Sequence, residues 1–139
     1  MRVTIIAFAI LFEVFYFGCT CGYKFGKKYF VEGMGFKSAE FISFVISLIC
    51  LLLFSFNEKI GVWLLWGYYL LLTVYMFMFH WRYTIFGATE KKLKGYNECF
   101  SSCIYLVKPS SIKLIPDLYH IIMSVFVLTM SVLLGIFIL

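Results

Sequence analysis

Charged residues are scarce in this sequence, and their scarcity excludes a soluble domain of ordinary composition. They make up 14% of the 139 residues, whereas 63% of the residues are hydrophobic. A typical soluble domain is about half apolar and about a quarter charged. Proline occurs only twice, and both prolines, Pro109 and Pro116, precede the last apolar run. The surplus of apolar side chains must be covered by lipid, which leaves room for one compact membrane domain.

Motifs that carry chemistry are also missing. The sequence has no recognisable set of nucleophile and base, no cofactor-binding motif, no internal repeat and no low-complexity tract. We therefore expect a protein that is not an enzyme and that binds no cofactor. The net charge of +5 does not indicate nucleic acid as a partner, because the positive residues lie between apolar runs, where they flank membrane helices.

Four apolar runs are each long enough to cross a bilayer as a helix, which takes about 20 residues. They cover residues 3–23, 38–56, 60–81 and 120–139. Only Asn57, Glu58 and Lys59 separate the second run from the third, and so short a link forces an antiparallel helical hairpin. The predicted fold class is an all-α, integral membrane four-helix bundle, in which residues 1–139 form a single transmembrane domain.

The segment 82–119 is the only sizeable part predicted to lie outside the membrane. Residues 89–94 are typical of a short helix, with an acid near its start and lysines near its end, and Gly95 should end it. Pro116 and Asp117 stand near a plausible start of the last helix.

Lysine and arginine are distributed unevenly between the two sides of the predicted bundle. Ten of the twelve lie in the loops 24–37 and 82–119, and only Arg2 and Lys59 lie on the other side. Loops rich in positive charge usually face the cytoplasm. We therefore expect both long loops in the cytoplasm and both termini outside or in a lumen, in a membrane that is either the plasma membrane or the endoplasmic reticulum.

Glu13 is a carboxylic acid in the middle of the first apolar run. An acid at that depth costs on the order of a few kcal/mol if it faces lipid, so we expect Glu13 to face protein, water or a partner. Ser47 and Thr73 lie at a matching depth and are available as hydrogen-bond partners. Three interpretations stay open: a protonated structural acid, a proton or cation site, and a polar anchor to a partner helix.

Small and polar residues recur along one face of each predicted helix, which is how helices associate in lipid. In the first run they are glycines at every fourth position. The stripes are, run by run, Gly18, Gly22 and Gly26; Glu40, Ser43, Ser47 and Cys50; Trp66, Tyr69, Thr73, Met76 and His80; and Asp117, Ser124, Ser131 and Gly135. We expect a semi-polar seam of packed helices, with a ligand-lined channel as the alternative. The residues expected to hold the bundle or to touch a partner are Glu13, Gly18, Gly22, Gly26, Ser43, Ser47, Ser124, Ser131 and Gly135.

The two histidines show no pattern of metal or haem ligation. His80 and His120 stand at the cytoplasmic ends of their runs, whereas haem ligands would face each other near mid-membrane. Asp117 and His120 are three residues apart, so they can pair on the first turn of the last helix.

The five cysteines include four on the expected cytoplasmic side. These are Cys19, Cys21, Cys99 and Cys103. Their spacing is loose for zinc, and a disulfide is not expected in a reducing compartment. We expect no metal, and free thiols with palmitoylation as an alternative.

The chain resembles the DoxX-like small four-helix membrane proteins, which include the chaperone of nicotinic receptors. The resemblance rests on residues 3–7 at the start of the first run, residues 22–25 at its end, and Phe79 and His80 at the end of the third run. It implies a bundle that assists another membrane protein, and it transfers no catalytic residue. The long segment before the last run departs from the family's compact layout. The cornichon cargo receptors, also short and four-spanning, have an acidic first loop containing Asn-Pro that is missing here.

The expected function follows from these features taken together. We expect a small accessory subunit, regulator or chaperone that binds a larger integral-membrane protein such as an ion pump, channel or transporter. The alternative is a small homo-oligomeric transporter in which Glu13 binds a proton or a cation. A third idea, an enzyme that acts on lipids, would use His80, Asp117 and His120 at the level of the lipid headgroups, although no motif supports it.

Overall fold

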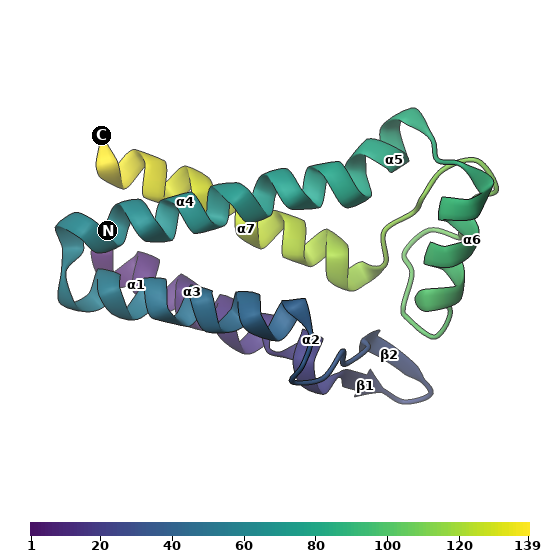
Figure 1. The fold of residues 1–139 in the computed structure, drawn as a ribbon, viewed down its shortest axis with the longest axis horizontal. Helices are drawn as coiled ribbons and strands as arrows, with labels where there is room; N and C mark the ends of the chain where they lie inside the picture. Colours follow the sequence, from purple (N-terminus) through teal and green to yellow (C-terminus); the bar gives the residue numbers. More distant parts are fainter.

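The computed structural model describes all residues 1–139, and most of them are helical (Figure 1). The helices are α1 (Arg2–Tyr16), α2 (Gly18–Cys21), α3 (Ala39–Phe56), α4 (Glu58–Met76), α5 (Arg82–Phe86), α6 (Glu90–Cys99) and α7 (Leu118–Ile138). A π-helical turn, η1 (Phe77–Trp81), joins α4 to α5. Two short strands, β1 (Tyr23–Phe25) and β2 (Lys28–Val31), pair in an antiparallel hairpin.

Four helical segments are long and apolar enough to cross a membrane, which confirms the expected number. They are Arg2–Cys21, Ala39–Phe56, Glu58–Phe86 and Leu118–Ile138. The third segment continues beyond residue 81, where the sequence predicted its end. The Thr84 hydroxyl holds this extension by donating to the Leu114 carbonyl at 2.7 Å, and Gly87, with φ of 87°, ends the helix.

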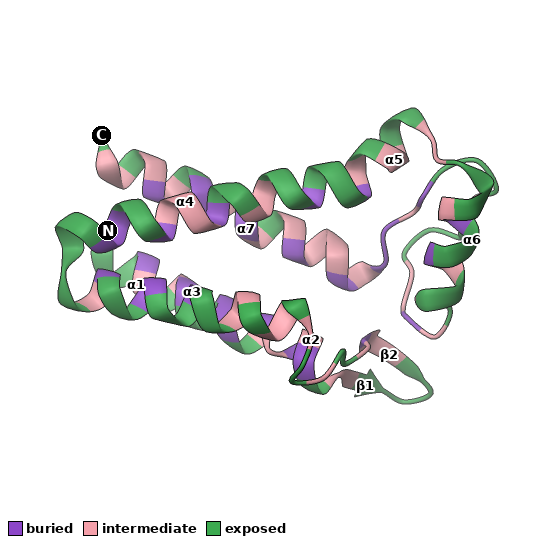
Figure 2. Cartoon of the chain, viewed as in Figure 1, coloured by how far each residue is buried: buried purple, intermediate pink, exposed green.

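The four long segments run side by side, with both chain termini at one end and α6 and the hairpin at the other (Figure 1). Side chains that face the interior form one apolar core, in which Phe12, Leu65 and Met130 are fully buried (Figure 2). The helices α3 and α4 approach so closely that a Cβ placed on Gly61 would lie 2.2 Å from the Phe54 backbone. Only glycine fits at this crossing, and it allows the tight hairpin that the short link predicted.

The outer faces of the long helices expose large apolar side chains along their length (Figure 2). Examples from the four segments are Val14, Ile46, Leu71 and Leu128. Soluble monomers rarely expose contiguous apolar surfaces of this extent. The arrangement, apolar on the inside and on the outside, is the one expected for helices solvated by lipid.

Side-chain caps mark where four of the helices begin. Ser38, Asn57, Thr89 and Asp117 each accept a hydrogen bond from a backbone N–H in the first turn of α3, α4, α6 and α7. The predicted start of the last helix beside Asp117 is therefore confirmed. The prediction that Gly95 ends the short loop helix is wrong, because α6 continues through Gly95 to Cys99.

The glycine stripe predicted in the first helix is not a helix face. Gly22 ends α2 with φ of 78°, and Gly26 forms the turn of the β-hairpin with φ of 61°. Both conformations are left-handed, and glycine adopts them without the steric cost that a side chain imposes. Only Gly18 lies in a helix, packed against Tyr23 and Val31. The structure is mostly helical, as predicted, and residues 23–31 add a short β-hairpin that the all-α prediction lacked.

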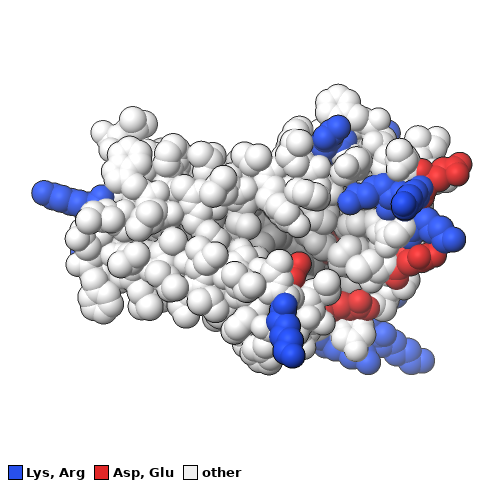
Figure 3. Space-filling view, in the orientation of Figure 1, with Lys and Arg blue, Asp and Glu red and all other residues white.

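Charged side chains gather at the end of the molecule that carries α6 and the hairpin, whereas the middle is almost free of them (Figure 3). We call this end the lysine-rich end, defined by the lysines of residues 24–37 and 91–113. At the opposite end, Arg2 pairs with Glu58 at 3.3 Å. The charges therefore bracket an apolar middle, as in a protein that crosses a bilayer.

Candidate functional site

Glu13 lies in the middle of the bundle and faces protein rather than lipid. The side chain of Ser47, on α3, donates a hydrogen bond to Glu13 Oε1, and both residues are buried. Ser47 was one of the two partners predicted for Glu13. The other, Thr73, pairs instead with Ser131 at 3.0 Å. Glu13 Oε2 is buried and has no hydrogen-bond partner.

The other polar residues of the predicted seam join helices within the chain. Ser43 pairs with Tyr68 across α3 and α4 at 3.1 Å, and Ser124 on α7 accepts a hydrogen bond from Trp81 Nε1 at 2.8 Å. Ser131 pairs with Thr73, as described above, and Gly135 lies against Trp66. The three serine side chains are therefore occupied inside the bundle.

Two histidines from distant parts of the sequence stack at the lysine-rich end. The rings of His80, in η1, and His120, in α7, have centroids 4.2 Å apart. Asp117 holds His120 in two ways, because Oδ1 accepts from the His120 backbone N–H at 3.1 Å and Oδ2 lies 2.7 Å from Nδ1. The predicted pairing of Asp117 with His120 is confirmed, whereas the stacking of His80 on His120 was not predicted.

The pairing with Asp117 determines which nitrogen of His120 can act on a ligand. A carboxylate accepts hydrogen bonds, so Nδ1 of His120 carries a proton and donates it to Asp117. In the neutral imidazole, Nε2 then holds the lone pair, and no residue of the chain bonds to it. A carboxylate that orients an imidazole in this way leaves Nε2 ready to accept a proton or a hydrogen bond.

A cavity of about 230 Å³ adjoins the stacked histidines, and we call it the histidine cavity. Helices α1 to α4, α6, α7 and the turn η1 all contribute to its lining. Most of its lining residues are hydrophobic, and the charged or strongly polar ones are Glu40, His80, Lys92 and His120. One water needs only roughly 15 Å³ of such space, so the histidine cavity can hold a multi-atom group.

Two residues that line the histidine cavity each have a buried polar atom without a hydrogen-bond partner in the chain. These atoms are His80 Nδ1 and the oxygen of the Tyr96 hydroxyl, in side chains that are 8% and 7% exposed. Burial raises the pKa of Tyr96 well above its usual range, so the hydroxyl keeps its proton and can donate it. An unpaired buried polar group costs about 1–3 kcal/mol.

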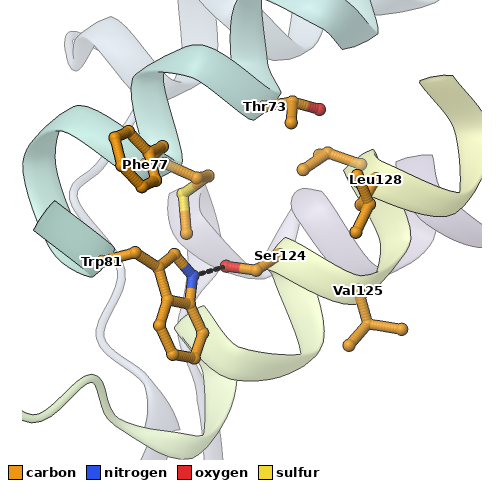
Figure 4. A pocket seen from close by; sticks show the side chains of 8 residues that line it. Thr73, Phe77, Trp81, Ser124, Val125 and Leu128 are labelled. Carbon is orange, nitrogen blue, oxygen red and sulfur yellow. Dashed lines mark hydrogen bonds between the residues drawn. The ribbon is translucent and has the colours of Figure 1, made fainter. Parts of the chain in front are cut away.

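The π-helical turn η1 places two neighbouring side chains, those of His80 and Trp81, in two different pockets. A π-turn accommodates one extra residue per turn and is frequent at functional sites. Here it carries His80 in the histidine cavity and Trp81 in a second, apolar pocket between α4 and α7 (Figure 4). No residue type marks a π-turn in sequence, and this is why the sequence predicted ordinary helix here.

No three side chains among His, Cys, Asp and Glu lie close enough together to hold a metal ion. The five cysteines are free thiols, and Cys19 lies 3.0 Å from the Tyr119 hydroxyl. The pair of histidines therefore offers hydrogen bonds and proton transfer rather than a built metal centre.

No protein-family model matches this chain, and neither a curated protein nor a solved structure shows significant similarity to it. The fold and the site define a class: a helical protein with four membrane-length helices and, at one end, a largely apolar cavity that includes two histidines and two charged residues.

Proposed function

We propose that the chain is a multi-pass integral membrane protein whose four long helices form one bundle across the bilayer. The support is the apolar outer surface of all four segments, bracketed by charges at both ends. In this proposal the lysine-rich end is cytoplasmic and the termini lie on the other side. A relationship to the DoxX-like proteins is part of the proposal and rests on the four-helix layout.

The function proposed for this bundle is to bind the polar part of an amphipathic small molecule in the histidine cavity. The observation that carries it is a cavity at the level where charges begin, whose lining includes both histidines, His80 and His120, together with Glu40 and Lys92. Apolar side chains, among them Leu72 and Met123, line the rest of the cavity. A molecule with a polar head and an apolar body matches both kinds of lining.

Native mass spectrometry of the protein purified in mild detergent tests this proposal. We expect wild-type protein to retain a small molecule, and His80→Phe to lose it, because the bulkier ring fills space and removes both ring nitrogens. Ser55→Ala is the control, since Ser55 lies near the opposite end and donates only to Leu51 of its own helix. Equal retention by all three proteins, or by none, contradicts the proposal.

A second candidate function, the accessory subunit, regulator or chaperone, is favoured by a different surface. At the lysine-rich end Phe25, Met34 and Phe36 are exposed, near the lysines of the hairpin. Such a mixed surface fits a larger membrane protein, such as a pump, channel or transporter, better than it fits water. The seam serines offer less support, because they bond within the bundle.

Mass spectrometry of proteins that co-purify from native membranes tests the accessory proposal. We expect one large membrane protein to be recovered with wild type and lost with the double variant Phe25→Ser, Phe36→Ser. Gly22 is unsuitable as a test position, because its φ of 78° means that any side chain would disturb the fold itself. Recovery of the same protein with the double variant would count against this proposal.

A further inference from the structure

Two unpaired charges of opposite sign line the histidine cavity. Glu40 stands in the first turn of α3, and Lys92 stands in the first turns of α6. Neither forms an ion pair within the chain, although both line one cavity of about 230 Å³. Because both side chains are unpaired, each can pair with the opposite charge of a ligand that carries one positive and one negative group.

Each charge is held where it is by its surroundings. Glu40 is half-buried at a helix N-terminus, where the helix dipole favours a negative charge. The Lys92 ammonium lies 5.3 Å from the ring centre of Tyr83 and 5.9 Å from that of Phe79, in cation–π contacts that keep it beside the cavity. The place of Glu40 is therefore set by the start of α3, and that of Lys92 by the aromatic rings beside α6.

Neutral hydrogen-bonding groups line the same cavity. Tyr96 and His120 are among them, and His120 Nε2 can accept a hydrogen bond when the ring is neutral, as derived above. A phosphate oxygen accepts from a hydroxyl and pairs with an ammonium, whereas a primary ammonium donates to a carboxylate and to a lone pair of nitrogen. The lining therefore offers partners to both halves of a zwitterion.

We propose that the ligand of the histidine cavity is a zwitterionic phospholipid headgroup, with its phosphate at Lys92 and its ammonium at Glu40. This inference rests on the proposed function, because it names the ligand of the same cavity. The position of the cavity at the lysine-rich end, beside an apolar middle, is the level at which the headgroups of a bilayer lie. Phosphoethanolamine has the required chemistry, whether it comes from the lipid or as the free compound.

The test measures which lipid the purified protein retains after exchange into nanodiscs made from equal parts of ethanolamine and glycerol phospholipids. We expect wild type to retain the ethanolamine lipid, and Lys92→Ala to reduce retention about tenfold or more, as the loss of a charged hydrogen bond predicts. Glu40→Gln should shift the preference toward the anionic glycerol lipid, because the group that recognises the ammonium is gone. Free phosphoethanolamine should displace the lipid if the headgroup alone is recognised, whereas failure to displace it assigns recognition to the whole lipid.

Two matched control variants test whether lipid retention depends on the charges that line the cavity or on any change of charge in this region. Lys91 neighbours Lys92 but does not line the histidine cavity, and Glu90 stands in the first turn of α6 as Glu40 does in that of α3. Lys91→Ala and Glu90→Gln should leave retention unchanged. The proposal of a zwitterionic ligand is overturned if wild type retains both lipids equally, or if neither Lys92→Ala nor Glu40→Gln changes lipid retention. If His80→Phe still abolishes retention in that case, the proposed binding function stands and only the ligand is wrong.

Discussion

At the scale of single residues, the pair Glu13 and Ser47 shows how a buried acid is tolerated in a bundle. Ser47→Ala removes the only hydrogen bond that Glu13 receives, and Glu13 Oε2 already lacks a partner. We expect a loss of about 1–3 kcal/mol in the free energy of unfolding, the usual cost of an unsatisfied buried group. Thermal unfolding in detergent measures it, with Ser55→Ala as the control. Equal melting temperatures for the two variants would show that Glu13 finds another partner.

Asp117 combines a helix cap with the orientation of His120, and Asp117→Asn separates the two roles. Asparagine caps a helix about as well as aspartate, so α7 should keep its start. Its amide can donate to Nδ1 of His120, which moves the ring proton to Nε2. Nitrogen NMR of the imidazole should show this change of tautomer. Persistence of the Nδ1 proton would contradict the assigned role of Asp117.

Residue-level predictions from the sequence succeeded where the partners are near each other along the chain. Asp117 and His120 are one turn apart, so periodicity suffices to pair them. Depth narrowed the partners of Glu13 to Ser47 and Thr73 without deciding between them, and only Ser47 bonds to it. The stacking of His80 on His120 depends on how α4 and α7 cross. No local pattern encodes that crossing. The sequence therefore placed His80, Asp117 and His120 at one level of the bundle but did not predict the histidine cavity.

At the scale of elements, the π-turn η1 is testable by deletion. Removing Met78, which is half-exposed, takes out the extra residue of the turn and should restore an α-helix. The residues that remain in the turn then move by up to one helical position, about 100° in a helix of 3.6 residues per turn, while the helices on either side keep their register. The indole N–H of Trp81 should lose its bond to Ser124, seen as a shifted NMR signal. Trp66, bonded to the Ser131 carbonyl, is the internal control, and an unshifted Trp81 signal would contradict this account.

Replacing glycine by alanine should have opposite effects on stability at Gly22 and at Gly67. Gly22→Ala should lower stability by about 1–2 kcal/mol, because φ of 78° strains any side chain. Gly67→Ala should raise it by up to about 1 kcal/mol, because Gly67 lies within α4 and a Cβ there meets nothing within 4 Å. Thermal unfolding of the two variants measures both changes. A shift of equal sign in both would contradict the assigned backbone roles.

The same glycines explain why the hairpin escaped prediction. Spacing by four residues fits a helix face, and Gly18, Gly22 and Gly26 have that spacing although only Gly18 is helical. Hydropathy located the four long helices because apolar length is a property of the sequence itself. A local sequence pattern does not distinguish a glycine with positive φ from a helical glycine, because the conformation depends on contacts with other segments, such as that of Gly22 with Gly33.

At the scale of the whole molecule, the uneven distribution of charge predicts one orientation in the membrane. Cys99 is exposed at the lysine-rich end, whereas Lys59 stands at the opposite end beside the start of α4. In a Cys21→Ser variant, Cys99 remains as the exposed thiol, because Cys103 is buried and burial raises its pKa to about 11. The thiolate is the reactive form, so Cys103 should react slowly at neutral pH.

A membrane-impermeant maleimide therefore reports on orientation. We expect Cys99 to react in inside-out vesicles and to be protected in right-side-out vesicles, because positive loops remain in the cytoplasm. The added variant Lys59→Cys should introduce a site with the opposite pattern. Since burial also raises the pKa of Cys99, its labelling should be faster in mildly alkaline buffer than at neutral pH. A reversed pattern would place the lysine-rich end outside. Reaction of both sites from the same side would mean that residue 59, in the first turn of α4, and Cys99 do not lie on opposite faces of the bilayer.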